Sequence, residues 1–219
     1  MRTEPLASGP TAPANTPLPR SALQRVVDTG LLRCAVPPAL GGTDGTLPDL
    51  AAGARHLREH DAEAADILRA QRLAIEALVR SRNVALRELW LPDLLTGLRA
   101  GTVALDGPPL SGHDTGRGWL LTGRFERIAN LPWEGFSLVA PAHLGDGPAS
   151  WVLLRSEEDG LSVEAPQAAA ARGSSERGSA LRMNRVFFRE DEWLGGPELR
   201  THLAPVAAAL SGGQPGAPT

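Results

Sequence analysis

The sequence predicts an α+β protein, in which an all-helical N-terminal domain precedes a small β-sandwich or barrel domain. Three observations predict this. Apolar residues recur at helical spacing over about residues 20–100, short apolar runs alternate with Gly- and Pro-rich turns from Thr102 onwards, and 219 residues suffice for two small cores. The expected division is a disordered tail over 1–19, helices over 20–100, a β-domain over 101–196, a short helix over 197–210 and a second tail over 211–219.

Composition excludes several classes of protein. The net charge is -3 and lysine is absent, so no basic surface for nucleic acid is expected. No apolar run approaches the roughly 20 residues of a membrane helix, and the first residues do not resemble a secretory signal. Cys34 is the only cysteine, which excludes an internal disulfide, and it is expected to be an ordinary small apolar residue. We therefore expect a soluble, cytoplasmic protein.

Caps and breakers define the predicted helices. Ser21 is the expected N-cap of the first, and prolines with paired glycines make residues 36–42 a loop. Thr46 or Leu47 begins a helix to about His60, Asp61 caps a helix over 62–80, and a helix over 83–91 is closed by Pro92. Gln71 lies on an apolar stripe and is expected to be a buried, hydrogen-bonded residue rather than a ligand.

The second half is predicted to contain strands and turns. A hairpin is expected from Trp119–Leu121, a Thr122-Gly123 turn and Arg124–Ile128, after a loop over 106–118. Leu181, Met183 and Phe187 are expected on one face of a final strand. The expected strands cover 102–105, 119–121, 124–128, 136–140, 150–154, 161–164 and 180–189, with a loop over 165–178.

Four passages resemble the acyl-CoA dehydrogenase-like flavoprotein superfamily, in the same order as in that family. They are a helix ending in Leu31-Leu32 followed by Val36-Pro37 to Gly41-Gly42, the run Leu91-Pro92 to Gly101, the run Gly118-Trp119 to Ile128-Ala129-Asn130, and Arg172 to Gly195. Together they cover about residues 20–198. The resemblance implies the family's N-terminal helical and middle β domains. The family's C-terminal four-helix bundle has no counterpart in these 219 residues.

The resemblance implies FAD bound against the β-domain and oxidation of a CH–CH group in an acyl-CoA thioester. Residue by residue, it places Leu105, Asp106, Ser111, Ile128 and Ala129 at the flavin. Asp106 stands where the family has a hydroxyl residue, and Ala129 stands where a second hydroxyl is expected. No catalytic residue is assigned, because the family's catalytic glutamate belongs to the absent bundle. A homo-oligomer or a partner chain would supply that domain.

Other readings remain open. The chain is alternatively a non-catalytic relative acting as a binding or assembly subunit, or a component of a flavin-dependent monooxygenase of the same superfamily. His56 and His60, at i and i+4, form a possible metal pair, but no third ligand is obvious, so we expect no metal site. His113 and Asp114 are expected to be a polar loop, and the acidic run 157–159 a solvated turn.

Overall fold

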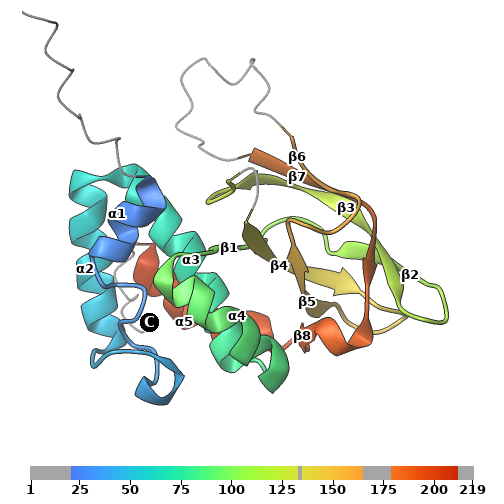
Figure 1. Cartoon of the computed structure of the whole chain (residues 1–219), viewed down its shortest axis with the longest axis horizontal. Coiled ribbons are helices and arrows are strands. Elements are labelled where there is room, and N and C mark those ends of the chain that lie inside the picture. The colour runs from blue at the N-terminus through green and yellow to red at the C-terminus, as the bar shows by residue number, and fades with distance from the viewer. Residues whose placement is uncertain (1–20, 133–134, 165–178, 212–219) are drawn as a thin grey trace, which may run out of the picture.

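The computed structural model describes residues 21–132, 135–164 and 179–211. The chain forms a layer of helices that packs against one side of a curved sheet, as Figure 1 shows. This arrangement confirms the predicted α+β class. The predicted tails, except for Ser211, and the predicted loop over 165–178 lie outside the described residues.

The helical layer follows the predicted caps closely. Its first four helices are α1 (Ala22–Asp28), α2 (Leu47–His60), α3 (Ala62–Arg80) and α4 (Val84–Thr96). Ser21 caps α1, and Thr46 and Asp49 form a capping box at the start of α2. Asp61 accepts a hydrogen bond from the backbone of Ala64 and so begins α3. Each helix therefore begins where a side-chain oxygen can satisfy free backbone N–H groups.

Helix α3 is the centre of this layer. Leu68, Ile75 and Leu78 are fully buried, and the helix contacts α1, α2, α4 and the final helix α5 (Leu199–Leu210). Arg72 is also fully buried on α3, and its guanidinium has no hydrogen-bond partner among the described residues. Burial lowers the pKa of Arg72, although the nearby carboxylate of Glu76 opposes that shift.

The β part is one eight-stranded sheet with the order β6-β7-β3-β2-β4-β5-β8, and β1 pairs with β4 in parallel. Neighbouring strands are antiparallel except for the β1–β4 and β2–β4 pairs. The strands are β1 (Ala100–Val103), β2 (Leu110–Asp114), β3 (Trp119–Ile128), β4 (Phe136–His143), β5 (Ser150–Arg155), β6 (Leu161–Glu164), β7 (Ser179–Phe188) and β8 (Trp193–Gly195).

The alternation of side chains along β4 and β5 joins two hydrophobic cores. Leu138 and Val152 face a core enclosed by the sheet, which also holds Phe125 from β3. Val139 and Leu153 face the opposite way and belong to the core of the helical layer. Because successive side chains of a strand point to opposite faces, this one hairpin supports both cores.

Two predicted features of the strands are wrong. Thr122 and Gly123 lie inside the continuous strand β3, and the hairpin turn lies instead between β2 and β3, where the Thr115 N–H bonds the Gly118 carbonyl at 2.9 Å. Gly123 is needed for close packing, since a Cβ there would lie 2.7 Å from Leu110. The predicted loop over 106–118 accordingly contains β2.

The predicted alternation on the last strand also fails. Leu181 and Met183 are buried, but Phe187 is 44% exposed and Val186 and Phe188 are buried instead. Arg185 has a left-handed backbone with φ of 58°, and the β3–β7 register shifts near this point. A bulge of this kind turns the following side chains to the other face.

Helix α4 continues past the predicted stop. Pro92 lies within it, and the helix ends at Thr96 with Gly97 in the left-handed conformation. Burial of Leu91, Leu94 and Leu95 offsets the hydrogen bond that a proline removes.

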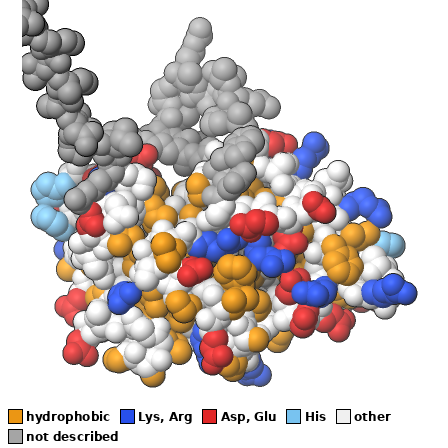
Figure 2. All heavy atoms as spheres, in the orientation of Figure 1, with side chains coloured by type: hydrophobic (Ala, Val, Ile, Leu, Met, Phe, Trp, Pro, Cys, Tyr) orange, Lys and Arg blue, Asp and Glu red, His pale blue; other side chains and the backbone are white. Residues whose placement is uncertain are grey.

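Apolar side chains are exposed mainly on α4. Leu89 is 61% and Val84 48% exposed, and Leu98, just beyond the helix, is 81% exposed. On the sheet, Phe187 is the large exposed apolar side chain among the described residues. Figure 2 shows apolar side chains interspersed with clusters of arginine and acidic groups on one face. None of the described helices is long and apolar enough to cross a membrane.

Candidate functional site

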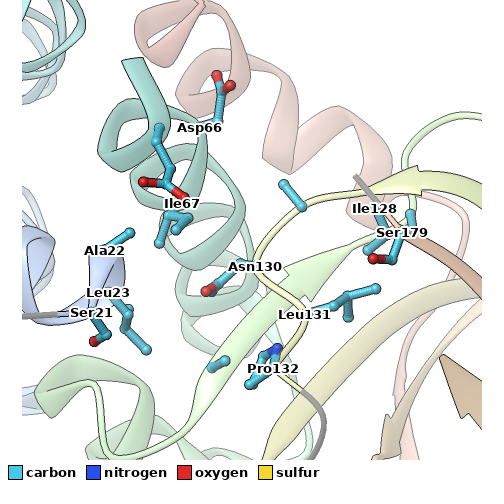
Figure 3. A pocket seen from close by; sticks show the side chains of 13 residues that line it. Ser21, Ala22, Leu23, Asp66, Ile67, Ile128, Asn130, Leu131, Pro132 and Ser179 are labelled. Carbon is cyan, nitrogen blue, oxygen red and sulfur yellow. The ribbon is translucent and has the colours of Figure 1, made fainter. Parts of the chain in front are cut away.

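A hollow lies between the helical layer and the corner that joins β3 to β4. It has a volume of about 420 Å³. Its walls come from the start of α1, one face of α3 and the corner, as Figure 3 shows. They include Leu23, Ile67, Ile128, Leu131 and Pro132. This volume is in the range of small-molecule sites, which are typically apolar with few polar groups.

A smaller and more polar hollow adjoins it. This hollow has a volume of about 140 Å³ and shares Asp66, Ile128 and Ala129 with the larger one. Leu105 and Asp106, which follow β1, line this smaller hollow. The two hollows adjoin at the residues they share, and the larger is mainly apolar whereas the smaller is more polar. We call the two hollows together the α3–β3 cavity.

A buried amide network holds the corner of the α3–β3 cavity in place. The Oε1 atom of Gln71 accepts hydrogen bonds from the Gly101 N–H at 2.6 Å and from Nδ2 of Asn130 at 2.8 Å. Its Nε2 donates to the carbonyls of Leu94 at 2.8 Å and Arg99 at 3.0 Å. All the hydrogen-bonding capacity of the Gln71 amide is used, which matches its predicted role as a satisfied buried residue.

The network explains an unusual backbone conformation. Asn130 has φ of 58°, a left-handed value that asparagine tolerates better than most residues. Its Nδ2 also donates to the Gly101 carbonyl at 2.9 Å. Asn130 thus ties the corner to both α3 and β1, and so fixes the positions of Ile128 and Ala129.

Most carboxylates at the α3–β3 cavity are engaged by arginines outside its lining. Glu63 pairs with Arg25 at 3.0 Å, and Asp66 pairs with Arg58 at 3.2 Å. Glu126 pairs with Arg124. Asp106 is the remaining carboxylate of the lining, and it has no hydrogen bond or ion pair among the described residues.

The cavity gathers four of the five predicted flavin-contact residues. Leu105, Asp106, Ile128 and Ala129 line it, although the first two follow β1 and the other two lie at the end of β3. Ser111 does not: it lies exposed on β2, paired with Thr122 and His143. Figure 1 shows β2 at the end of the sheet that is distant from the helices.

Several residues of the cavity were not predicted from the sequence. The wall from α3, including Asp66, Ile67 and Arg69, had no motif to mark it. Its only sequence signal is the helical spacing of these positions with Ala70 and Leu73, which line the same hollow. Contacts between an N-terminal helix and a strand corner sixty residues away depend on the tertiary fold.

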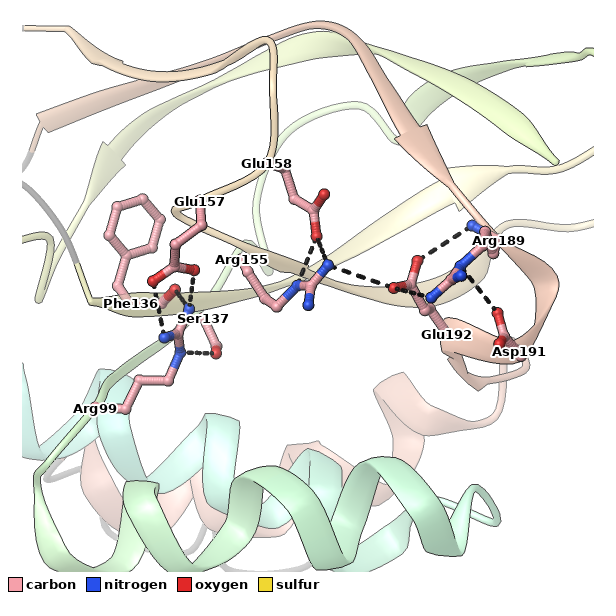
Figure 4. A network of polar contacts seen from close by, with 9 residues as sticks. All are labelled: Arg99, Phe136, Ser137, Arg155, Glu157, Glu158, Arg189, Asp191 and Glu192. Atoms are coloured by element: carbon pink, nitrogen blue, oxygen red, sulfur yellow. Dashed lines mark hydrogen bonds and ion pairs between the residues drawn. The ribbon is translucent and has the colours of Figure 1, made fainter.

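A second polar network braces the sheet against the helical layer (Figure 4). Arg99, at the start of β1, binds Glu157 through two hydrogen bonds of 3.0 and 2.6 Å. It also donates to Ser137 Oγ at 2.7 Å, and its guanidinium lies 4.7 Å from the centre of the Trp90 ring. The Arg99 guanidinium lowers the pKa of Glu157 to about 2.

The acidic run 157–159 is therefore not merely a solvated turn, as the sequence had suggested. Glu157 binds Arg99, and Glu158 binds Arg155. The predicted polar pair His113 and Asp114 lies exposed on β2 rather than in a loop. Cys34 is half-buried, and burial raises the pKa of its thiol, as fits an unreactive cysteine.

Comparisons with known proteins point to one superfamily. No profile of a known protein family matches the chain. The chain is 32% identical over 151 residues to acyl-CoA dehydrogenase FadE27 of Mycobacterium tuberculosis, a match that covers 67% of this chain and 39% of that protein. It superposes on a chain of the ChsE4-ChsE5 complex from Mycobacterium tuberculosis with a TM-score of 0.68 and 25% identity, covering 83% of this chain and 49% of the other.

The chain belongs to the acyl-CoA dehydrogenase-like superfamily. A glutaryl-CoA dehydrogenase from Mycobacterium smegmatis, solved in complex with FADH2, shares the fold with a TM-score of 0.73 at 17% identity and matches 84% of this chain and 50% of its own. The chain therefore spans about two-fifths of the curated relative and about half of the solved chains.

Within an acyl-CoA dehydrogenase-like protein, the α3–β3 cavity is the place to test for a flavin fit. The larger hollow has the volume and the apolar walls that a planar ring system needs. Arg69 and Arg127 add positive charge at the polar end, where an anionic group could lie. Ala129 and Asp106 provide no hydroxyl group. The cavity therefore fits the ring in size and polarity, with fewer side-chain hydrogen bonds than the resemblance implies.

Proposed function

We propose that this chain is an FAD-binding component of an acyl-CoA dehydrogenase-like oxidoreductase, acting on CH–CH groups of acyl-CoA thioesters together with a second chain. One observation carries the proposal: Leu105, Asp106, Ile128 and Ala129, selected by resemblance alone, all line the smaller hollow of the α3–β3 cavity. FAD, when bound, supplies the acceptor for the hydrogen that leaves the substrate as hydride.

The proposed task of this chain is to position the ring and exclude water. Ile67, Ile128 and Leu131 would cover the ring with apolar side chains, since they already line the cavity. The Gln71–Asn130 network holds the corner rigid, so that the ring would meet preformed walls. Arg69 would face the anionic part of the cofactor, because it lines the polar hollow and has no ion pair among the described residues.

The proton-abstracting carboxylate is assigned to the second chain. Of the carboxylates around the cavity, Glu63, Asp66 and Glu126 are each engaged by an arginine, so none is free to approach a substrate. The exposed Leu89 and Leu98 offer apolar surface for such a partner or for a second copy. One structural relative belongs to the ChsE4-ChsE5 complex of two named proteins, which supports a heteromeric assembly.

A second candidate function is a non-catalytic assembly subunit. The replacement of hydroxyl residues by Asp106 and Ala129 favours it, because the charge of Asp106 would oppose an electron-rich flavin. The two candidates differ in whether this chain contacts flavin.

Absorption spectroscopy tests the proposal. The chain is purified alone and then together with the product of any adjacent reading frame, each after incubation with FAD and gel filtration. We expect a visible flavin spectrum in the mixture that bleaches on addition of an acyl-CoA. Colourless protein in both samples would overturn the FAD assignment. The variant Ile128→Arg, whose folding is checked by circular dichroism, places a large charged side chain in this cavity. If a mixture that contains the folded variant still retains flavin, the flavin is not bound in this cavity, and the chain is better described as an assembly subunit.

A further inference from the structure

Three metal-ligating side chains share one face at the end of α2. They are His56, Glu59 and His60, at positions i, i+3 and i+4 of the helix. One donor atom from each lies within 4.8 Å of the others. We propose that these three side chains bind a divalent transition-metal ion of the zinc class. The site uses none of the side chains that line the α3–β3 cavity and does not depend on the proposed function.

The hydrogen bond of His60 prepares its ring for a metal. Its Nδ1 atom lies 2.8 Å from the carbonyl oxygen of His56. A carbonyl only accepts, so Nδ1 carries the proton and Nε2 keeps its lone pair for a ligand. Metal-binding histidines commonly have this arrangement, in which a backbone carbonyl fixes the tautomer. The His56 ring lies beside it, with 4.4 Å between the ring centres.

The carboxylate of Glu59 is available. It makes no hydrogen bond or ion pair among the described residues, whereas its acidic neighbours are engaged. Asp61 binds Arg25 at 2.7 Å, and Asp66 binds Arg58 at 3.2 Å. The prediction that the two histidines have no third ligand is corrected by Glu59, which one helical turn brings beside both of them.

The local electrostatics favour a cation in one respect and oppose it in another. His60 is the last residue of α2, where the helix dipole and free carbonyls place negative potential. Arg58 is turned to Asp66 and to the Leu210 carbonyl, so that its charge is partly neutralised. Arg55 remains on the exposed surface beside the site. These opposing electrostatic effects indicate that the site binds a divalent metal ion with moderate affinity.

The chemistry of the donors selects the ion. Two imidazole nitrogens and one carboxylate oxygen suit Zn²⁺ and its neighbours rather than Mg²⁺ or Ca²⁺, which take oxygen ligands. Three protein ligands leave a fourth position for water. All three side chains are exposed, so the small rotations that bring the donor atoms to bonding distance are unhindered. In Figure 2 histidine side chains are in view at the surface on the helical side.

Calorimetric titration with Zn²⁺ tests the site on the full chain without an affinity tag. We expect one Zn²⁺ bound per chain at pH 7.5. His56→Ala and His60→Ala should each weaken binding at least about ten-fold, because even the loss of an outer-shell partner has an effect of that size. His113→Ala removes an exposed histidine on β2 and should bind like the wild type. Glu59→Gln should give a smaller loss than either histidine variant.

The pH dependence gives a second readout. Zn²⁺ affinity should fall as the pH is lowered, because protons compete with the metal for the imidazole nitrogens. Circular dichroism of the variants checks that α2 is intact. No saturable binding by the wild type, unchanged affinity in a His56→Ala/His60→Ala double variant, or one Zn²⁺ for two chains would each overturn the proposal.

Discussion

The side-chain amide of Asn130 donates a hydrogen bond to Oε1 of Gln71 at 2.8 Å, and this contact links the helical layer to the corner of the α3–β3 cavity. The same oxygen accepts from the backbone of Gly101, which fixes the orientation of the amide, since a backbone N–H can only donate. A single fully buried side chain thus connects α3, β1 and the end of β3.

Replacing Gln71 should therefore lower the stability of the fold. In Gln71→Ala the backbone N–H of Gly101 and two buried carbonyls lose their partner, and we expect the free energy of unfolding to fall by about 2–4 kcal/mol. Urea denaturation measures it. Gln24→Ala is the matched control, because Gln24 is exposed on α1, and it should change stability by less than about 0.5 kcal/mol. Equal losses in both variants would contradict the role of the network.

The Arg99–Glu157 pair should make stability depend on pH. The pKa of Glu157 is about 2 in the fold, below its ordinary value of 4.5, so the unfolded chain binds the proton more tightly. The ion pair thus stabilises the fold fully above pH 4.5, and this contribution is lost as pH falls from 4.5 towards 2. Because the Glu157 side chain is 57% exposed, we expect less than about 1 kcal/mol.

Comparison of wild type and Glu157→Gln between pH 7 and pH 3 measures this contribution. The wild type should be more stable at pH 7, and the difference should narrow at pH 3. Glu88→Gln serves as the control, since Glu88 is exposed and has no ion pair among the described residues. A difference that stays constant over this range would show that the ion pair is not its source.

The buried guanidinium of Arg72 should be destabilising. Its three nitrogens have no partner among the described residues, and burial lowers its pKa. Arg72→Met keeps the length of the side chain and removes the unpaired charge, so we expect a gain of about 1–4 kcal/mol in the free energy of unfolding. Thermal and urea unfolding measure it, with the exposed Arg82→Met as control. A loss of stability would mean that Arg72 has a partner in solution.

Restoring hydroxyl groups should strengthen flavin binding if FAD occupies the α3–β3 cavity. Ala129→Thr adds one hydrogen-bonding group, for which about 1 kcal/mol, or roughly five-fold tighter binding, is expected. Asp106→Asn removes a negative charge and should act in the same direction. Quenching of FAD fluorescence measures the affinity. Ser111→Ala should have no effect, because Ser111 lies on β2 away from the cavity; weaker binding in that variant would locate the flavin elsewhere.

The helices were predicted well because their signals are local. Thr46 and Asp61 cap their helices through their own side chains, so the sequence alone indicates where α2 and α3 begin. The single strand β3 was mistaken for a hairpin, since Thr122-Gly123 has the composition of a turn. There the glycine serves a close contact with Leu110, which only the tertiary structure shows.

Only part of the candidate site was predicted, because the sequence indicates local features and not contacts between distant segments. The resemblance selected Leu105, Asp106, Ile128 and Ala129, whose positions are fixed along single strands. The wall from α3 could not be predicted, because it depends on how the helical layer packs on the sheet. Glu59 joins the histidine pair only through the helix face that it shares with them, which the i, i+4 spacing of the two histidines does not by itself indicate.

The return of α5 to the helical layer has a consequence for synthesis. Ser81 Oγ donates to the carbonyl of Leu194, 113 positions later, and α5 packs on α2 and α3. While the ribosome is still making β8 and α5, the face of α3 that α5 will cover stays exposed to solvent, even if α1 to α4 have already formed. The apolar surface of the first helices to be synthesised would therefore be the last to be covered, and contacts between residues so far apart in sequence form slowly. During that interval the nascent chain would be a natural client for chaperones that hold apolar helices.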